Sequence, residues 1–169
     1  MKFYPSRIAL NSRFFCAFLN DQHYLIKPLM SSSVEILPRQ RAILDIPLNR
    51  HLGIVYDGST DGVAKSHFEA VPALAAFDGQ LHGGVLSVLF EAAAFLALAP
   101  LLQESQHAVT HDLHVSLMRP VPIGARCDLT ARVMRSGRSL VFLDVSEDVD
   151  DKLVASARIT KCIVKINHA

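Results

Sequence analysis

The chain has 169 residues, enough for one domain with a substantial core and a short extension. Its formal net charge is +1 with dispersed charges, and it has no Trp and only three Tyr, which argues against nucleic-acid binding. Three cysteines without CxxC spacing exclude a disulfide framework and favour a reduced, cytoplasmic setting.

The N-terminal residues differ in composition from the rest of the chain. Three basic residues precede the first acidic residue, Asp21, and the apolar stretch 14–19 is shorter than a signal peptide requires. A basic, acid-poor transit peptide stays open on composition. We expect instead that residues 1–30 are a disordered or non-native extension, with translation beginning at Met30, and that residues 31–169 form one domain.

The first expected elements of the domain are short. Residues 34–51 have a roughly helical apolar pattern that Pro47 interrupts. Residues 53–56 and 63–68 are typical of two short strands around a glycine-containing turn. These patterns predict a helical segment followed by a hairpin.

The most apolar segment, residues 81–98, predicts a long helix that Pro100 closes. The run 85–102 approaches the length of a membrane span. Glu91 would then lie near the middle of the bilayer, where an unpaired acid is strongly disfavoured. We therefore expect the buried helix of a soluble protein and no membrane partner.

After this helix the apolar period changes to two, which is typical of strands. One face of the first strand carries Val109, His111, Leu113, Val115 and Leu117, and Arg119-Pro120 ends that strand. Three further strands, 125–133, 140–149 and 153–166, are joined by tight turns and predict an antiparallel meander. A long apolar helix before such a meander predicts an α+β fold in which a curled antiparallel sheet wraps the helix.

Candidate site residues stand at the start of the long helix. His82-Gly83-Gly84 opens it, and two glycines let a ligand approach the unpaired N–H groups of a helix N-terminus, which suit an anion or an oxyanion. Glu91 follows two turns later, and we expect it to be buried among apolar side chains and a partner subunit. Because burying a carboxylate is costly unless it is paired or used, the two features together predict a catalytic site.

The spacing of the two groups predicts an oligomer. Gly83 and Glu91 are eight residues apart, or about 12 Å along one helix, so one carbonyl carbon cannot lie within about 3 Å of both. If they act on the same bond, the N–H comes from one subunit and the carboxylate from another. This favours a symmetric dimer with sites at the interface.

Four motifs together carry a resemblance to a known family. They are Leu81-His82-Gly83-Gly84 followed by Glu91, Thr110-His111-Asp112, Met118-Arg119-Pro120 and Arg135-Ser136-Gly137-Arg138-Ser139-Leu140. With them, residues 45–166 resemble the hotdog-fold acyl-CoA thioesterases, similar to the phenylacetic-acid-pathway and 4-hydroxybenzoyl-CoA thioesterases. The resemblance implies a hotdog fold and hydrolysis of acyl-CoA to free acid and CoA, with no cofactor.

The resemblance also implies roles for residues at the helix and on the next strand. The N–H of Gly83 would polarise the thioester carbonyl, and Glu91 of the neighbouring subunit would act as base or nucleophile. Thr110 matches a strand hydroxyl that helps to place the attacking water in some relatives. His82 belongs to the same catalytic group, where it either fixes the loop before the helix or transfers a proton.

Other residues would bind the substrate. Gly84 lies at the same helix terminus, and the turn with Arg135, Gly137 and Arg138 resembles the segment that meets the phosphates or pantetheine arm of CoA. A solvated hairpin turn is the alternative for these arginines. The family resemblance further implies a homodimer or a dimer of dimers.

Alternatives to a thioesterase remain. Relatives often carry Asn or Gln where this chain has Ala76, so a non-catalytic acyl-CoA-binding module stays open. A hydratase or dehydratase of acyl thioesters on the same fold is disfavoured because its acid follows the helix glycine more closely. The spacing of His107, His111 and His114 does not suit a metal site, since one strand would hold the first two about 13 Å apart.

Overall fold

A computed structural model describes residues 34–166. The helical elements are α1 (Pro38–Leu44), α2 (Pro47–Leu52), η1 (Pro72–Leu74), α3 (Gly83–Leu98) and η2 (Ala99–Leu101). The strands are β1 (Val55–Thr60), β2 (Val63–Glu69), β3 (Gln106–Leu117), β4 (Arg126–Ser136), β5 (Leu140–Val149) and β6 (Lys152–Lys165). The extension expected at residues 1–30 lies outside the described residues, so its prediction stays a prediction.

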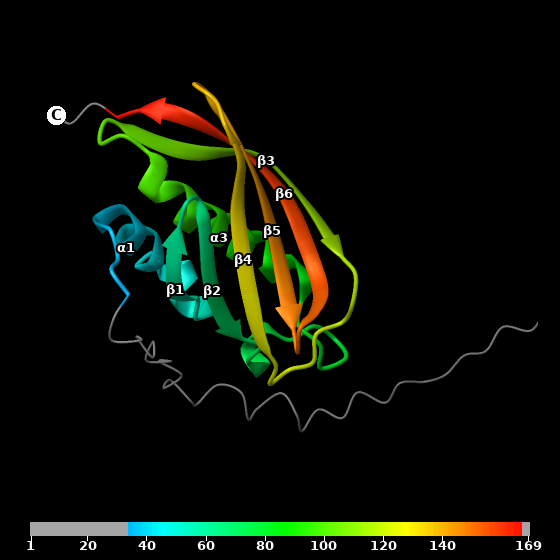
Figure 1. Ribbon diagram of the computed structural model, residues 1–169. Helices are drawn as coiled ribbons and strands as arrows, with labels where there is room; N and C mark the ends of the chain where they lie inside the picture. Colours follow the sequence, from blue (N-terminus) through cyan, green and yellow to red (C-terminus); the bar gives the residue numbers. More distant parts are fainter. Residues whose placement is uncertain (1–33, 167–169) are drawn as a thin grey trace, which may run out of the picture.

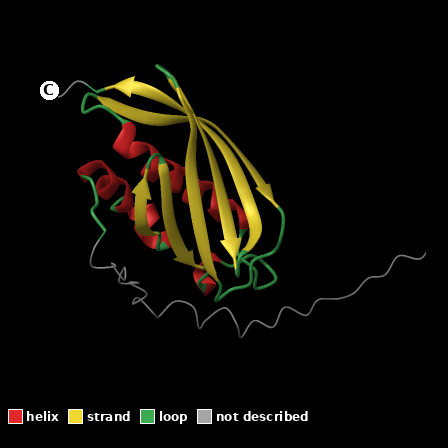
Figure 2. Ribbon diagram, in the orientation of Figure 1, coloured by secondary structure: helices red, strands yellow, loops and turns green. Residues whose placement is uncertain are grey.

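One antiparallel sheet curls around the long helix (Figure 1). The strand order is β1-β2-β4-β5-β6-β3, and the helices lie together on the inner face of the curl (Figure 2). The predicted meander is confirmed as β4-β5-β6, and Asp150 and Asp151 make its second turn with positive φ at both positions. The chain therefore has the predicted α+β architecture.

Helix α3 is the centre of the core. From Leu89 onward nearly every residue of the helix is buried, with Glu91 the exception. By length and composition the segment 83–101 could span a membrane, but most of it is buried against the sheet, as in the core helix of a globular domain. Its many alanines let the strands pack closely around it.

Strand β3 departs from the predicted alternation of its faces. It lies at the sheet edge beside β6. Its pairing with β6 shifts between Thr110 and Asp112, which is a β-bulge. The extra residue reverses the alternation of faces, so the expectation that Val109 shares a face with Leu113 and Val115 is wrong: Val109 is exposed, whereas the other two pack on the core.

A buried carboxyl group lies in the sheet, outside the set of residues predicted for the site. Glu147 on β5 is fully buried, and neither of its carboxyl oxygens has a hydrogen-bond partner among residues 34–166. Burial raises the pKa of Glu147 to about 7 because the charged form loses its hydration. Near neutral pH this group therefore changes between a neutral and a charged form inside the core.

We predict that the free energy of unfolding falls as the pH rises from about 4.5 to 7. The unfolded chain releases the Glu147 proton near the ordinary pKa of 4.5, while the folded chain holds it to about 7, so the stabilisation present below pH 4.5 is lost through that window. The loss is on the order of 3 kcal/mol. Urea unfolding of the wild type and Glu147→Gln at several pH values measures it.

The variant should lack this component of the pH dependence. Glu104→Gln, at an exposed acid, serves as the matched control and should follow the wild type. Parallel stability–pH curves for wild type and Glu147→Gln would contradict the prediction.

Candidate functional site

The N-terminus of α3 is capped by the residue before it. His82 is the N-cap, and its Nδ1 accepts a hydrogen bond from the Gly84 N–H at 3.0 Å. The Gly83 N–H has no acceptor within the described part of the chain. It lies at the first turn of a helix, where the partial positive charge favours an oxyanion or a polarised carbonyl.

Gly83 packs directly against the end of β3. A Cβ at position 83 would clash with the tip of the Leu117 side chain, which is 59% exposed and can move. Because glycine has no Cβ, a ligand can approach the Gly83 backbone closely once the Leu117 side chain moves.

The carboxylate lies against the opposite part of β3. Thr110 Oγ1 is 2.6 Å from Glu91 Oε1, and Lys161 Nζ on β6 is 2.9 Å from the same Thr110 oxygen. Lys161 Nζ is also 3.9 Å from Glu91 Oε1. Thr110 faces the helix because the bulge that follows it reverses the alternation of the strand.

Within one protomer the two predicted groups do not meet. Gly83 lies beside Leu117 and Glu91 beside Thr110, which are about 20 Å apart along β3 at about 3.3 Å per residue. The expected burial of Glu91 is not found in the single chain, where its side chain is 50% exposed. It lies next to Thr110 of β3, which is an edge strand of the sheet in the described chain.

The arginine-containing turn connects β4 and β5 at the Thr110 end of the sheet. Gly137 donates to Leu140 O at 2.8 Å, and Ile163 of β6 donates to Ser139 O at 2.9 Å. Val141, the second residue of β5, pairs with Lys161. The turn with Arg135 and Arg138 therefore stands at the same end of the sheet as Glu91, with both arginines exposed.

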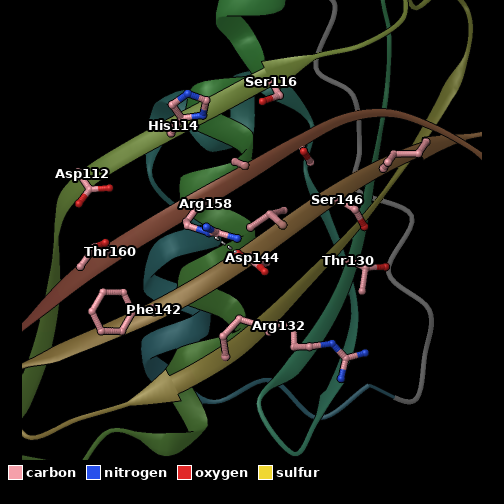
Figure 3. Close-up of a pocket in the computed structure, with 15 residues that line it drawn as sticks. Asp112, His114, Ser116, Thr130, Arg132, Phe142, Asp144, Ser146, Arg158 and Thr160 are labelled. Carbon is pink, nitrogen blue, oxygen red and sulfur yellow. Dashed lines mark hydrogen bonds and ion pairs between the residues drawn. The ribbon is translucent and has the colours of Figure 1, made fainter.

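The outer face of the sheet carries a separate open concavity (Figure 3). Its polar lining includes Asp112, His114, Arg132, Asp144 and Arg158, with an ion pair of 3.3 Å between Arg158 Nε and Asp144 Oδ1. None of the predicted site residues lines it. His107, by contrast, packs against Phe95 of α3 with the two rings tilted and their centroids 5.3 Å apart, so His107 and His114 lie in different surroundings.

One residue of the site was not predicted from the sequence. Lys161 is only 2% exposed and lies two residues after the buried Ile159, on the same face of β6. A lysine at an inward position of a strand is a rare arrangement, and this is the signal that could have revealed it.

Three phenylalanines on and before the helix lie in different environments. Phe90 and Phe95 are buried in the core, whereas Phe77 is 99% exposed on the loop before His82.

Comparisons with known proteins agree on the class of fold. Thioesterase HI1161 from Haemophilus influenzae superposes with a TM-score of 0.72 at 22% identity, covering 80% of this chain and 95% of that one. A mutant of the phenylacetic acid degradation protein PaaI from Thermus thermophilus gives 0.64 at 26% identity, over 69% and 97%. The fold is the hotdog fold, with α3 as the helix that the sheet wraps.

The sequence comparisons narrow this class. The model of the thioesterase superfamily matches residues 78–146. Acyl-coenzyme A thioesterase 13 from Mus musculus is 31% identical over 85 residues, 49% of this chain and 60% of that protein. The chain thus spans about three fifths of the length of the curated relatives that it matches. The predicted resemblance to hotdog acyl-CoA thioesterases is confirmed.

We predict that His82 acts on the helix terminus as a cap. His82→Ala should lower the free energy of unfolding by about 1 kcal/mol, because the Gly84 N–H loses its acceptor. His82→Asn should keep most of the stability, since Asn is a favourable N-cap. Urea denaturation measures both, and equal destabilisation by the two substitutions would contradict the capping role.

Proposed function

We propose that the protein hydrolyses acyl-CoA thioesters to the free acid and CoA. The observation that carries this proposal is that helix α3 bears two groups suited to the reaction. Its Glu91 carboxylate accepts a hydrogen bond from Thr110 of β3, and its first N–H, that of Gly83, lacks an acceptor among the described residues. The match to the thioesterase superfamily and the likeness to acyl-coenzyme A thioesterase 13 support the same chemistry.

The chemistry follows from the two groups. The Gly83 N–H donates to the thioester oxygen and stabilises the negative charge that develops there. As a base, Glu91 takes a proton from a water whose oxygen bonds to the carbonyl carbon, and the departing CoA thiolate receives that proton. As a nucleophile, Glu91 bonds to the carbonyl carbon itself while the thiolate leaves, and water then hydrolyses the anhydride.

In this proposal the protein recognises its substrate through the CoA group. Arg135 and Arg138 stand exposed beside Gly137 at the Glu91 end of the sheet, where guanidinium groups suit CoA phosphates. Gly84 follows Gly83 at the start of α3, where we expect the acyl group and its carbonyl oxygen to bind.

A binding module without turnover is the second candidate. Ala76 offers no side-chain amide near the carbonyl, and its own N–H bonds to Gln80 O at 2.7 Å. Gln80 is the amide-bearing side chain nearest to it in the loop before His82. Tight binding of acyl-CoA thioesters with no thiol release at any chain length would favour this candidate over a thioesterase.

We predict that Glu91→Gln lowers the rate of CoA release by roughly two orders of magnitude or more, because an amide can neither accept the proton nor attack the carbonyl. The fold should persist, since the side chain is half exposed and keeps its shape. Thiol release from short, medium, long and aryl CoA esters measures the rate, and thermal unfolding measures the fold.

Two further variants sharpen this measurement. Glu91→Asp should keep partial activity, since it withdraws the same carboxylate by one methylene. Glu104→Gln changes an exposed acid elsewhere and should leave the rate unchanged. Equal thiol release by wild type and Glu91→Gln would refute the proposal.

We infer that the working form is at least a two-fold dimer joined along β3. This strand lies at the sheet edge, pairs only with β6 within the described chain, and exposes Val109 and Leu117, with Met118 just beyond it. Such an edge is open to pairing with another strand. Antiparallel pairing with a second copy brings the Leu117 end of one β3 to the Thr110 end of the other, and so brings Gly83 of one subunit toward Glu91 of its partner.

We predict that two inactive variants recover activity when they are co-expressed. Gly83→Pro removes the N–H at a position where the first helical turn accepts proline, and the extended backbone of His82 is compatible with a following proline. In the heterodimer with Glu91→Gln, one site carries both lesions and the other neither. Co-expressed chains should recover about a quarter of wild-type activity, from half of the dimers with one of two sites intact.

Gly83→Ala is the matched control, because its methyl group meets the same Leu117 tip but its N–H remains. It should retain much more activity than Gly83→Pro. No recovery in the co-expressed protein, with dimers present by light scattering, would show that each site is built within one chain.

A further inference from the structure

Lys161 is a buried cation that the proposed reaction does not yet use. It lies on β6 opposite Thr110 of β3 and Val141 of β5, and only 2% of its side chain is exposed. Burial lowers the pKa of Lys161, and the negative charge of Glu91 opposes that effect. Burying an ammonium group is costly, so its polar contacts and what they achieve matter.

Both polar contacts of the Lys161 ammonium among the described residues lead to the carboxylate. It donates to Thr110 Oγ1 at 2.9 Å and lies 3.9 Å from Glu91 Oε1. The ring of Phe95 lies 6.0 Å from Nζ, where an aromatic face attracts a cation. These groups come from three elements, β6, β3 and α3, so Lys161 joins the sheet edge to the helix.

The donor inventory sets the direction of the hydrogen bonds. An ammonium group can only donate, so the Thr110 oxygen accepts from Lys161. An ionised carboxylate can only accept, so the Thr110 O–H donates to Glu91 Oε1. The Thr110 proton is therefore committed to the carboxylate and is not available to a water molecule.

We propose that Lys161 is a positioning residue that orients the Glu91 carboxylate through Thr110. Thr110 thus orients Glu91 and not the attacking water, and Oε1 is the anchored oxygen. Oε2 then faces the substrate of the composite site. This inference rests on the proposed function, and it holds whether Glu91 acts as base or as nucleophile.

A purely structural Lys161 predicts different behaviour from a positioning one. Its removal would change stability and leave turnover per folded molecule unchanged. Lys161→Met fills similar space without a charge, and because Glu91 is half exposed and can be hydrated, we expect little loss of stability. A positioning role predicts a fall in kcat with little change in KM, since substrate contacts lie elsewhere.

The experiment is a double-mutant cycle on the full chain, with acyl-CoA hydrolysis and thermal unfolding as readouts. We expect Lys161→Met and Thr110→Val each to lower kcat by about tenfold or more with KM within about twofold. The double variant should be little slower than either single one, because both act on one oxygen. Lys152→Met, at the exposed start of β6, is the matched control and should behave as wild type.

Lys161→Gln provides a second variant, which also serves if Lys161→Met fails to fold. Its amide keeps a neutral donor near Thr110, so it should retain more of kcat than the Met variant while staying several-fold below wild type. A folded Lys161→Met with wild-type kcat would overturn the proposal, as would rate losses that multiply in the double variant. A wild type that releases no thiol from any acyl-CoA would instead refute the proposed function itself.

Discussion

The rigidity of helix α3 is the constraint on which the proposed site depends. Gly83 and Glu91 are fixed on one helix whose packing against the curled sheet prevents them from approaching each other. Each therefore has its own neighbour on β3, Leu117 for the glycine and Thr110 for the acid. In the proposed dimer the edge position of β3 resolves this separation, because antiparallel pairing of two such edges would bring the Leu117 end of one β3 beside the Thr110 end of the other.

A single extra residue in β3 decides which side chains enter the site. Without the bulge between Thr110 and Asp112, one unbroken face would carry Val109, Leu113 and Val115, as the alternating pattern predicts. With it, Thr110 turns toward the helix and Val109 toward solvent. Bulges reorient side chains next to functional sites in many sheets, and here the reoriented hydroxyl joins Lys161 to Glu91.

Much of the fold was predictable because it depends on local patterns. The break at Pro47, the long helix and the meander follow from proline geometry, apolar period and turn residues, each of which acts over a few positions. The place of β3 beside β6 depends on pairing between distant strands, which no local pattern records. The bulge is equally invisible, because one inserted residue leaves the composition of the strand unchanged.

The site divides along the same line. His82, Gly83 and Glu91 stand on one continuous helix and its cap, so their spacing alone sets their separation. Lys161 lies 70 positions beyond Glu91 in the sequence and contacts Thr110 only because β6 and β3 pair. Its one sequence signal is a charge at an inward position of a strand, and that signal has meaning only once the strand's two faces are assigned.

Two buried ionisable groups in the same sheet show why burial alone does not mark a functional residue. Glu147 is as inaccessible as Lys161, yet neither of its oxygens has a hydrogen-bond partner in the described chain, and burial raises its pKa to about 7. Lys161 has a hydroxyl acceptor, a carboxylate and an aromatic ring around its ammonium, which offset the loss of hydration. Burial lowers the pKa of Lys161, and the nearby charge of Glu91 opposes that effect. The partners of Lys161 lead to the half-exposed Glu91 carboxylate of α3 beside the edge strand β3, which is why we propose a positioning role for Lys161 and predict for Glu147 an effect on stability.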